Sequence, residues 1–393
     1  MEFFIDLIKG EAILCEAQQC GGAGYTQHDR EQVIPKSLEY GSRSYPVTEI
    51  VDSWANPGIF SPSISDIIFP KTIKHIRERA FANYCFVMDK LELPESLLSI
   101  GREAFWDKSM LLSYKCQFKE GRITENHFKY SVRECIPYIK TVVIGSNVTE
   151  IGNDAFPPNM EVICHSTFVE RIEGNTFRSI KFTDDDGILL FKVIDPIKCE
   201  VAVCGMVNSE KFSEIVKVPK MVTFRGVDYT VTTIGQRAFT VDNTNMGCCC
   251  IENIELPDTL VAIEDEAFLD CYFQHIEVPC GVEYIGDNVW TDIVDIVIKL
   301  PKTLRYIGYC NLGKENCKFI SDSPYINVKR KMILNDKGED LMSVGEDALV
   351  FQIYNKYHYS EYFVVDRDID MMRNSSRYKR VYIDMSGWNK FNV

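Results

Sequence analysis

The sequence contains none of the short motifs that are typical of common enzyme active sites. It has no Gly-x-Ser-x-Gly, no glycine-rich phosphate loop and no His-Glu-x-x-His, motifs that position a nucleophilic serine, a phosphate group and a catalytic zinc ion. Its six histidines form no recognisable local motif with a nucleophile. Since a catalytic triad can be assembled from distant residues, an enzyme stays a minor alternative, and we predict no catalytic residues.

The sequence also has no long apolar run and no excess of positive charge. No stretch is apolar for long enough to span a membrane as a helix. The formal net charge of −14 disfavours nucleic acids and anionic lipid surfaces, because phosphate binding needs a concentrated positive field. The basic clusters at 329–331 and 377–380 are local exceptions, which we interpret as solvated faces of a capping segment. We predict neither nucleic-acid binding nor membrane insertion.

The fifteen cysteines lack the spacing of a zinc site. There is no Cys-x-x-Cys, whereas structural zinc sites usually take their ligands from spaced pairs. An odd number of thiols cannot all pair within one chain. Cys15 and Cys204 end matching apolar segments, and Cys271 follows Phe268 ahead of the next apolar segment, which predicts reduced, core-packed thiols. Disulfides in an oxidising compartment are the alternative. We predict no metal and no cofactor.

What the sequence does contain is a recurring phrase: an apolar pair ending in proline, then Ile-Gly, then Ala-Phe. One copy spans Leu91–Phe105, and another spans Ile254–Phe268. Successive isoleucines of the phrase are 24 residues apart between Ile76 and Ile100, and 22 residues apart between Ile285 and Ile307. This is the length of a leucine-rich repeat, in which each unit forms one coil of a solenoid.

Ten candidate copies can be placed. Five clean copies are Ile76 with Ala80-Phe81, Ile100 with Ala104-Phe105, Ile151 with Ala155-Phe156, Ile234 with Ala238-Phe239, and Ile263 with Ala267-Phe268. Five degenerate copies are Ile50 with Trp54-Ala55, Ile172 with Thr176-Phe177, Ile285 with Val289-Trp290, Ile307 with Asn311-Leu312, and Val344 with Ala348-Leu349. The interval of 51 residues between Ile100 and Ile151 indicates either a loop insertion or a lost coil.

Each copy predicts a short strand followed by a turn. Ile254 and Leu256 alternate with Glu255, as one strand with a buried and an exposed face requires. Pro257 then ends the strand, because proline cannot donate to the ladder. The segment from Ile-Gly to Ala-Phe is expected to form one helical or 3₁₀ turn. The fold class predicted is a mostly β repeat solenoid of the α/β type, with short parallel strands.

A second level of repetition indicates an internal duplication. The segment 6–15 matches 195–204 at an offset of 189, and Val47–Ile50 matches Val231–Ile234 at an offset of 184. We predict two modules, 1–185 and 186–393, each opening with its own β segment, and a C-terminal capping region from about residue 318. The acidic run Asp184–Gly187 near the joint lacks the spacing of a calcium loop, so we interpret it as a solvated turn.

The repeated phrase resembles the BspA-like leucine-rich repeat family, known from surface proteins of bacteria and parasitic protists. Val222–Gly235 is similar to the entry strand of that family, and Ser323–Tyr325 with Lys331–Asn335 is similar to an insertion between its repeats. The resemblance covers about residues 6–349. It implies adhesion or protein binding and carries no catalytic residues.

The resemblance implies a general cellular location and a general class of partner, but no specific partner. The family implies a cell-surface or secreted protein, but Met1–Asp6 has no basic region and no sustained apolar run, so a signal peptide is not visible and a cytoplasmic protein is the alternative. We expect a non-enzymatic adhesion or host-interaction protein whose partner is a protein, such as a host matrix or cell-surface protein. An intracellular protein-interaction scaffold is the alternative, and the oligomeric state is open.

The predicted binding face consists of strand residues that alternate with buried ones and therefore form columns on the exposed sheet face. These residues are Ile68, Glu92, Val143, Ile215, Lys217, Asn253, Glu255, His275, Glu277, Val297 and Lys299. An ordinary solvated sheet face is the competing interpretation. A second candidate surface is the tyrosine-rich stretch Tyr354–Tyr362, whose alternative role is a polar cap.

Overall fold

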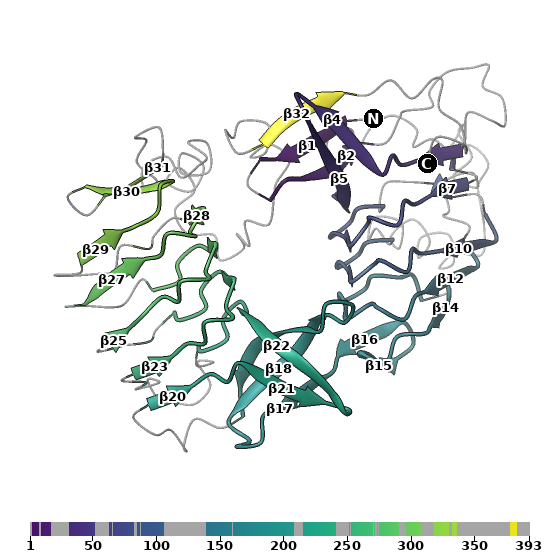
Figure 1. The fold of residues 1–393 in the computed structure, drawn as a ribbon. Coiled ribbons are helices and arrows are strands. Elements are labelled where there is room, and N and C mark those ends of the chain that lie inside the picture. Colours follow the sequence, from purple (N-terminus) through teal and green to yellow (C-terminus); the bar gives the residue numbers. More distant parts are fainter. Residues whose placement is uncertain are drawn as a thin grey trace, which may run out of the picture. The chain divides into compact units, whose positions relative to one another are not determined.

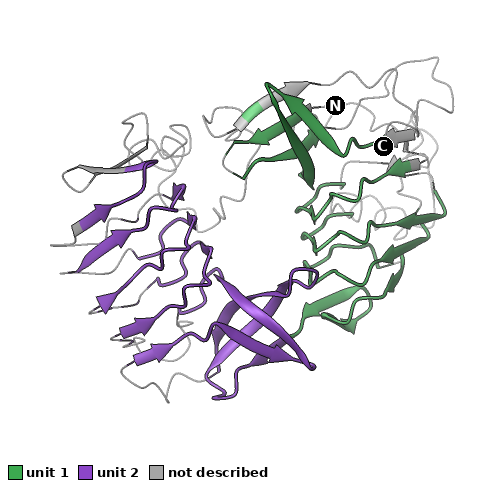
Figure 2. Cartoon of the chain, in the orientation of Figure 1, with its two compact units in different colours: residues 1–180, 378–393 green, residues 181–377 purple. Residues whose placement is uncertain are grey.

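The structure of the protein is a computed structural model. It describes residues 2–7, 9–16, 31–51, 63–64, 66–81, 85–86, 88–105, 139–158, 160–207, 215–240, 251, 253–269, 271, 273, 275–290, 296–308, 311, 318–329, 332–335 and 378–382. The chain divides into two compact units (Figure 2): unit 1 is 1–180 with 378–393, and unit 2 is 181–377. The predicted module boundary at 185/186 stays a prediction.

Unit 1 opens with the first strands of a mixed sheet. Strand β1 (Glu2–Asp6) pairs antiparallel with β2 (Glu11–Glu16), and β2 pairs parallel with β5 (Arg43–Ile50). A hairpin joins β4 (Ser37–Tyr40) to β5. Side chains on both faces of β1 are buried, from Phe3 to Asp6, so this strand belongs to the core.

Unit 2 opens with the same arrangement. Strand β18 (Leu189–Asp195) pairs antiparallel with β19 (Glu200–Met206), β19 pairs parallel with β22 (Val227–Ile234), and β21 (Met221–Phe224) forms the hairpin with β22. The β2–β5 ladder shifts register between Ala12 and Ile13, and the β19–β22 ladder shifts at the corresponding Val201 and Ala202. Even this irregularity is repeated, which confirms the predicted internal duplication.

After these sheets, each unit stacks its coils through two rows of short parallel strands (Figure 1). In unit 1 the first row contains β3 (Glu31–Val33) with β7 (Asp66–Ile68), β6 (Ser63–Ile64) with β9 (Cys85–Phe86), and β10 (Lys90–Glu92), β12 (Thr141–Ile144) and β14 (Glu161–Cys164). The second row extends β5 with β8 (His75–Ile76), β11 (Ser99–Ile100) and β13 (Glu150–Ile151).

Unit 2 repeats both rows. The first contains β20 (Ile215–Lys217), β23 (Asn253–Glu255) and β25 (His275–Ile276), and then β27 (Val297–Leu300) with β29 (Lys318–Ser321). The second extends β22 with β24 (Ala262–Ile263), β26 (Tyr284–Ile285) and β28 (Tyr306–Ile307). The predicted mostly β solenoid with short parallel strands is confirmed.

The prolines of the phrase end the first strand of a coil and begin a turn. The carbonyl of Pro94 accepts a hydrogen bond from the backbone N–H of Leu97 at 3.0 Å, and the carbonyl of Pro257 accepts one from Leu260 at 3.2 Å. Proline fixes its own φ and has no N–H to leave unpaired. Strands β10 and β23 accordingly end two residues before their prolines.

The segment from Ile-Gly to Ala-Phe forms a tight turn. The residue just before the alanine, or before the valine that replaces alanine in one coil, has a left-handed backbone conformation. The residues with positive φ at this position are Arg79, Glu103, Asp154, Arg237, Glu266 and Asn288. Backbone groups of the turn bond to the next coil, as where Phe105 N–H donates to the Ala155 carbonyl at 2.9 Å. No helix is present among the described residues, so the predicted helical turns are not confirmed.

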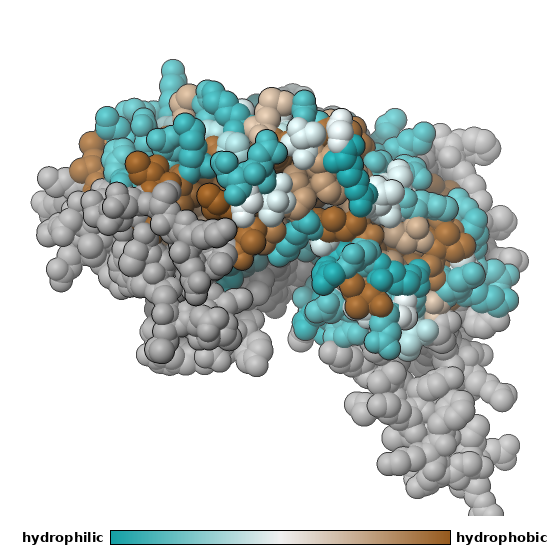
Figure 3. Space-filling view, turned by 90° about the horizontal axis from the view of Figure 1, so that it is seen from below, coloured by the Kyte–Doolittle hydropathy of each residue, from teal (hydrophilic) through white to brown (hydrophobic). Residues whose placement is uncertain are grey.

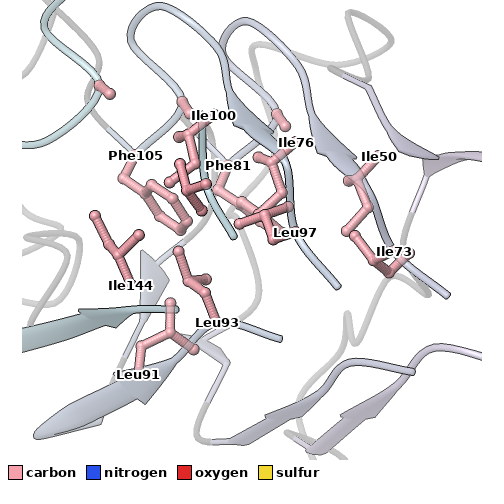
Figure 4. Packing of buried hydrophobic residues seen from close by; sticks show 14 of the residues in the cluster. Ile50, Ile73, Ile76, Phe81, Leu91, Leu93, Leu97, Ile100, Phe105 and Ile144 are labelled. Atoms are coloured by element: carbon pink, nitrogen blue, oxygen red, sulfur yellow. The ribbon is translucent and has the colours of Figure 1, made fainter. Parts of the chain in front are cut away.

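The core of each unit contains columns in which successive coils contribute equivalent, mostly identical, side chains. Ile50, Ile76 and Ile100 lie in a row (Figure 4) and are at most 3% exposed. The rings of Phe81 and Phe105 stack with their centroids 5.1 Å apart. Because every coil buries its apolar side against its neighbours, no coil is stable alone.

The long interval between Ile100 and Ile151 is an insertion and not a lost coil. Ile100 pairs directly with Ile151 across the β11–β13 ladder, so the two coils are adjacent. The segment 106–138 therefore enters between adjacent coils without separating them, and its own conformation lies outside the described residues.

The predicted coil at Ile172 with Thr176-Phe177 is wrong. These residues form an antiparallel hairpin of β15 (Val169–Glu173) and β16 (Thr176–Ser179), and Ile172 is 52% exposed. Phe177 is nevertheless buried with the core cluster of unit 1. The sequence pattern correctly predicted that Phe177 is buried, but it predicted a coil where the backbone forms a hairpin. A hairpin can bury one phenylalanine as well as a coil can.

The remaining degenerate copies have different outcomes. Ile285 with Val289 and Trp290 is confirmed, since all three side chains are fully buried. Ile307 and Asn311 are also buried, whereas Leu312, Trp54-Ala55 and the copy at Val344 lie outside the described residues. Past residue 318, where a cap was predicted, β30 (Ile326–Lys329) and β31 (Met332–Asn335) form a hairpin.

Candidate binding surface

In unit 1 the first-row strands bring Glu92 and Val143 of the predicted face into register. Lys90 pairs with Thr141, and Glu92 pairs with Val143. The ladder continues into β14, where Glu161 follows Thr141 and Ile163 follows Val143. Adjacent strands lie about 4.8 Å apart, so each column is a continuous row of side chains.

Unit 2 has an equivalent ladder. Ile215, Asn253 and His275 form one column, and Lys217 pairs with Glu255 in the next. All of these side chains are exposed except that of Asn253, which is half-buried. We call these five residues, together with Glu277, the unit 2 ladder face.

Charged neighbours on both ladders form ion pairs. Lys217 Nζ lies 3.1 Å from Glu255 Oε2. In unit 1 the Lys90 ammonium group holds the pKa of Glu92 below its ordinary value, through a hydrogen bond first and through charge second. Both pairs are exposed, and exposed pairs contribute little to the free energy of folding. Each pair places opposite charges side by side on an exposed strand face.

Apolar residues interrupt this charged surface. Ile215 is 50% exposed and Val297 is 47% exposed, while the predicted apolar members Ile68 and Val143 are half-buried. Figure 3 shows hydrophobic residues in several separate groups among hydrophilic ones on the face in view. A non-obligate interface is about as apolar as the rest of a protein surface, so this mixture suits either an interface or an ordinary solvated face.

In unit 2, Val297 and Lys299 lie on a different ladder from the other predicted residues. Strand β25 ends at Ile276, so Glu277 lies just beyond the ladder of β20, β23 and β25. Among the described residues β25 is the last strand of its sheet. Val297 pairs with Lys318, and Lys299 pairs with Ile320, in the β27–β29 ladder. That the columns form one continuous face stays a prediction.

Two exposed apolar residues on these ladders were missed by the sequence analysis. Ile163 on β14 is 38% exposed, and Ile320 on β29 is 49% exposed. Each follows a buried Val162 or Phe319, so the same alternation that identified the other columns would have found them.

The other predicted residues are placed as follows. Ile68 lies on β7 opposite Val33 of β3. Tyr354–Tyr362 lies outside the described residues. Asp184–Gly187 is a turn, in which Asp184 Oδ1 accepts the backbone N–H of Ile188 at 3.0 Å. Within the described part of the chain, no group of three or more His, Cys, Asp or Glu side chains could hold a metal ion.

The cysteines whose side chains the structure describes differ in burial. Cys15 and Cys271 are buried, Cys164, Cys199 and Cys204 are half-buried, and Cys280 is exposed. Core packing is therefore confirmed for Cys15 and Cys271. In the part of the chain that the structure describes, no helix is long and apolar enough to cross a membrane.

Comparisons with known proteins gave one family match and several solved structures of low similarity. No curated protein matches the chain at a significant level.

Several solved structures match the chain, including the following three. A leucine-rich repeat protein from Bacteroides capillosus has 17% identity, covers 36% of this chain and 98% of its own, and has a TM-score of 0.23. A leucine rich cell surface protein from Faecalibacterium prausnitzii has 13% identity, with coverages of 81% and 93% and a TM-score of 0.20. The pneumococcal vaccine antigen PcpA has 18% identity, with coverages of 74% and 75% and a TM-score of 0.20.

TM-scores this low carry no argument about function, so the family model is the informative match. The model of the BspA type leucine rich repeat region matches residues 58–163 and 208–324 in six copies. Such repeats are typical of protein-interaction and surface proteins. Since the model matches more than half of the sequence, the chain belongs to the BspA type leucine rich repeat family.

Proposed function

We propose that this protein is a non-enzymatic adhesion protein that binds a protein partner through the exposed faces of its first-row ladders. The single observation that carries this proposal is Ile215, which is half exposed at one end of a regular column and adjacent to the Lys217–Glu255 ion pair. An apolar residue beside ordered charges supplies both the apolar contact and the polar specificity of an interface.

The ladder also supplies rigidity. Ile215, Asn253 and His275 lie on paired strands, whose buried residues Val216, Ile254 and Ile276 pack into the core. A partner that binds such a face does not have to order loops, so less conformational entropy is lost on association. The partner class is a protein with a mixed apolar and charged surface, such as a host matrix or cell-surface protein.

A photo-crosslinking experiment tests this proposal. A benzophenone amino acid replaces His275 on the unit 2 ladder face, and in the control it replaces the exposed Glu283, which lies just before β26 in the second row. We expect a defined crosslinked protein from intact cells or host matrix with the first variant only. Equal crosslinking at both positions would contradict a specific ladder face.

Substitutions then test the same face in the full chain. The triple variant Ile215→Asp, Glu255→Lys, Glu277→Lys should weaken binding of the captured partner at least about tenfold, which corresponds to about 1.4 kcal/mol. The control Val261→Asp, Glu283→Lys makes the same two kinds of substitution at exposed residues outside the first row. Unaltered binding by the triple variant at an unchanged melting temperature would reject this face.

Labelling of intact cells separates adhesion from the scaffold alternative. An adhesion protein should react with a membrane-impermeant reagent and be digested by added protease. A protein that becomes accessible only after lysis would contradict the adhesion role and favour an intracellular scaffold.

A further inference from the structure

The outer edge of β1 is covered by a strand from the far end of the sequence. Strand β32 (Tyr378–Tyr382) pairs antiparallel with β1 over its whole length, from Glu2 opposite Tyr382 to Asp6 opposite Tyr378. Figure 1 shows β32 beside β1 in unit 1. The Lys379 ammonium group also lies 5.9 Å from the centroid of the Tyr40 ring on β4.

Unit 2 covers the equivalent edge in a different way. There β17 (Lys181–Thr183) pairs antiparallel with β18, with Lys181 opposite Lys192. Strand β17 immediately precedes β18 in the sequence and is joined to it by the turn at Asp184–Gly187. The same edge of the duplicated sheet is therefore covered by a local segment in unit 2 and by a distant one in unit 1.

An uncovered β1 edge would be a template for another strand. Phe3, Phe4 and Ile5 are fully buried, and without β32 the backbone groups on one side of this strand would lose their ladder partners. An edge strand with free N–H and C=O groups pairs readily with another chain. The β1 edge is therefore an acceptor site for a strand with the sequence Tyr-Lys-Arg-Val-Tyr.

Chain connectivity does not restrict which copy supplies that strand. Residues 336–377 connect β31 to β32 in the sequence, a segment whose fully extended length is about 140 Å. Exchange of an identical element between two copies preserves every contact made by that element, so it is a low-cost route to association.

We propose that the β1 edge accepts β32 from a second copy of this chain, and that the protein forms strand-exchanged oligomers as its concentration rises. Each chain has one acceptor edge and one donor strand. Reciprocal exchange therefore gives closed dimers, and non-reciprocal exchange gives open head-to-tail chains. For an adhesion protein, such oligomers would multiply the number of ladder faces that bind together.

Disulfide trapping tests the exchange in the full-length protein. Glu2→Cys and Tyr382→Cys place thiols at directly opposed positions of the β1–β32 ladder. One protein carries both substitutions, and two further proteins carry one each. After mild oxidation, mass spectrometry identifies the specific disulfide between positions 2 and 382, which distinguishes it from disulfides of the native cysteines.

We expect the double variant to form this disulfide within one chain at low concentration. A mixture of the two single variants should form it between chains, with a yield that rises about tenfold for each tenfold rise in concentration while exchange is minor. A synthetic peptide of residues 376–384 should reduce that yield. If the mixture gives no intermolecular disulfide up to millimolar concentration while the double variant crosslinks, exchange is refuted. If neither crosslinks, the acceptor edge itself is refuted.

The matched control is the local pair in unit 2. Lys181→Cys and Lys192→Cys occupy opposed positions of the β17–β18 ladder, where the donor strand is tied to its acceptor by a short turn. We expect a disulfide within the double variant and none between mixed single variants. If the control variants crosslink between chains as strongly as the variants at positions 2 and 382, random collision of chains would explain both disulfides. That result would overturn the proposal.

Discussion

The ring of Phe105 stacks on the ring of Phe156 with their centroids 5.4 Å apart and an interplanar angle of 10°, although the segment 106–138 lies between them in the sequence. Phe81 continues the same stack at 5.1 Å from Phe105. The stack passes through three consecutive coils of unit 1, so Phe105 is in contact with both of its neighbouring coils.

Replacing Phe105 by alanine should therefore destabilise unit 1 strongly. Phe105 is 2% exposed, and truncation of a buried phenylalanine costs about 3–5 kcal/mol through lost burial and an unfilled cavity. Denaturant unfolding should show the loss. The exposed Glu92→Ala variant on the same coil should lose less than about 0.5 kcal/mol. A neutral Phe105→Ala variant would mean that the coil register is wrong.

Gly101 should not tolerate a side chain, for a reason of space. A Cβ at this position would lie 2.2 Å from the backbone nitrogen of Glu78 in the preceding coil, and that atom cannot move without displacing the coil. We expect Gly101→Ala to lower the free energy of unfolding by about 1–3 kcal/mol, as measured by thermal or denaturant unfolding.

The opposite substitution serves as the control for backbone effects. Asp154 is exposed and has a φ of 54°, a left-handed conformation that costs a residue with a side chain about 1–2 kcal/mol. Glycine relieves that strain but loses more entropy on folding, so Asp154→Gly should be neutral or stabilising by up to about 1 kcal/mol. A strong loss of stability would contradict the left-handed turn.

Asn311 should be essential to the last described coil of unit 2. Its amide group accepts a hydrogen bond from Val289 N–H at 2.8 Å and donates to the carbonyls of Gly286 at 2.6 Å and Gly308 at 2.9 Å. Alanine would leave these buried groups without those bonds, at about 1–3 kcal/mol for each unsatisfied group. We expect Asn311→Ala to cost about 3 kcal/mol or more.

The half-buried Asn253 on the ladder face provides the comparison. Asn253→Ala should cost less than about 1 kcal/mol in the same unfolding measurement, because the position stays accessible to water. If both alanine variants lost the same free energy of unfolding, the hydrogen bonds of Asn311 would contribute no additional stability.

The thiol of Cys164 should react more slowly than that of Cys280. Desolvation by burial raises the pKa of Cys164, opposed by a backbone hydrogen bond from Ser166 and by the charge of Arg171, whereas Cys280 is exposed. Alkylation at pH 8, followed by mass spectrometry, should modify Cys280 first, and the difference should narrow as the pH rises. Faster modification of Cys164 would contradict its environment.

The same shift has a defined sign for stability. The folded state holds the Cys164 proton more tightly than the unfolded chain, whose thiol has a pKa near 8.5. The resulting stabilisation is therefore fully present below that pH and is lost as the pH rises through the raised pKa. A Cys164→Ser variant should lack this part of the alkaline decrease in stability.

Much of the fold could be predicted because the repeated phrase acts locally. Isoleucine, proline and Ala-Phe recur within about 22 residues, and each has a role within one coil or with the next: Ile263 pairs with Ile285, and Phe239 stacks on Phe268 at 5.3 Å. The ladder faces were predicted for the same reason, since alternation within a strand assigns each residue to a face.

The prediction at Ile172 was wrong because two backbone conformations, a coil and a hairpin, fit the same apolar pattern. Phe177 is buried whether its segment is a coil or a hairpin, so the pattern around Ile172 could not distinguish the two. Strand pairing beyond β25 depends on coil stacking, which a sequence pattern does not record, so only the structure shows that Val297 and Lys299 lie in the β27–β29 ladder. Ile163 and Ile320 were missed although the alternation of buried and exposed residues on β14 and β29 marks both.

The sequence by itself determined the coil register, the internal duplication and the exposed sides of the strands, because these depend on residues close together in the chain. Only the tertiary structure decided that 106–138 is an insertion, that Val169–Ser179 is a hairpin and that β32 covers β1. Some of these features pair segments that are distant in sequence, and the hairpin is one of two backbone conformations that bury the same phenylalanine. None of them leaves a periodic signal in the sequence, because their free energy comes from contacts that exist only after the chain has folded.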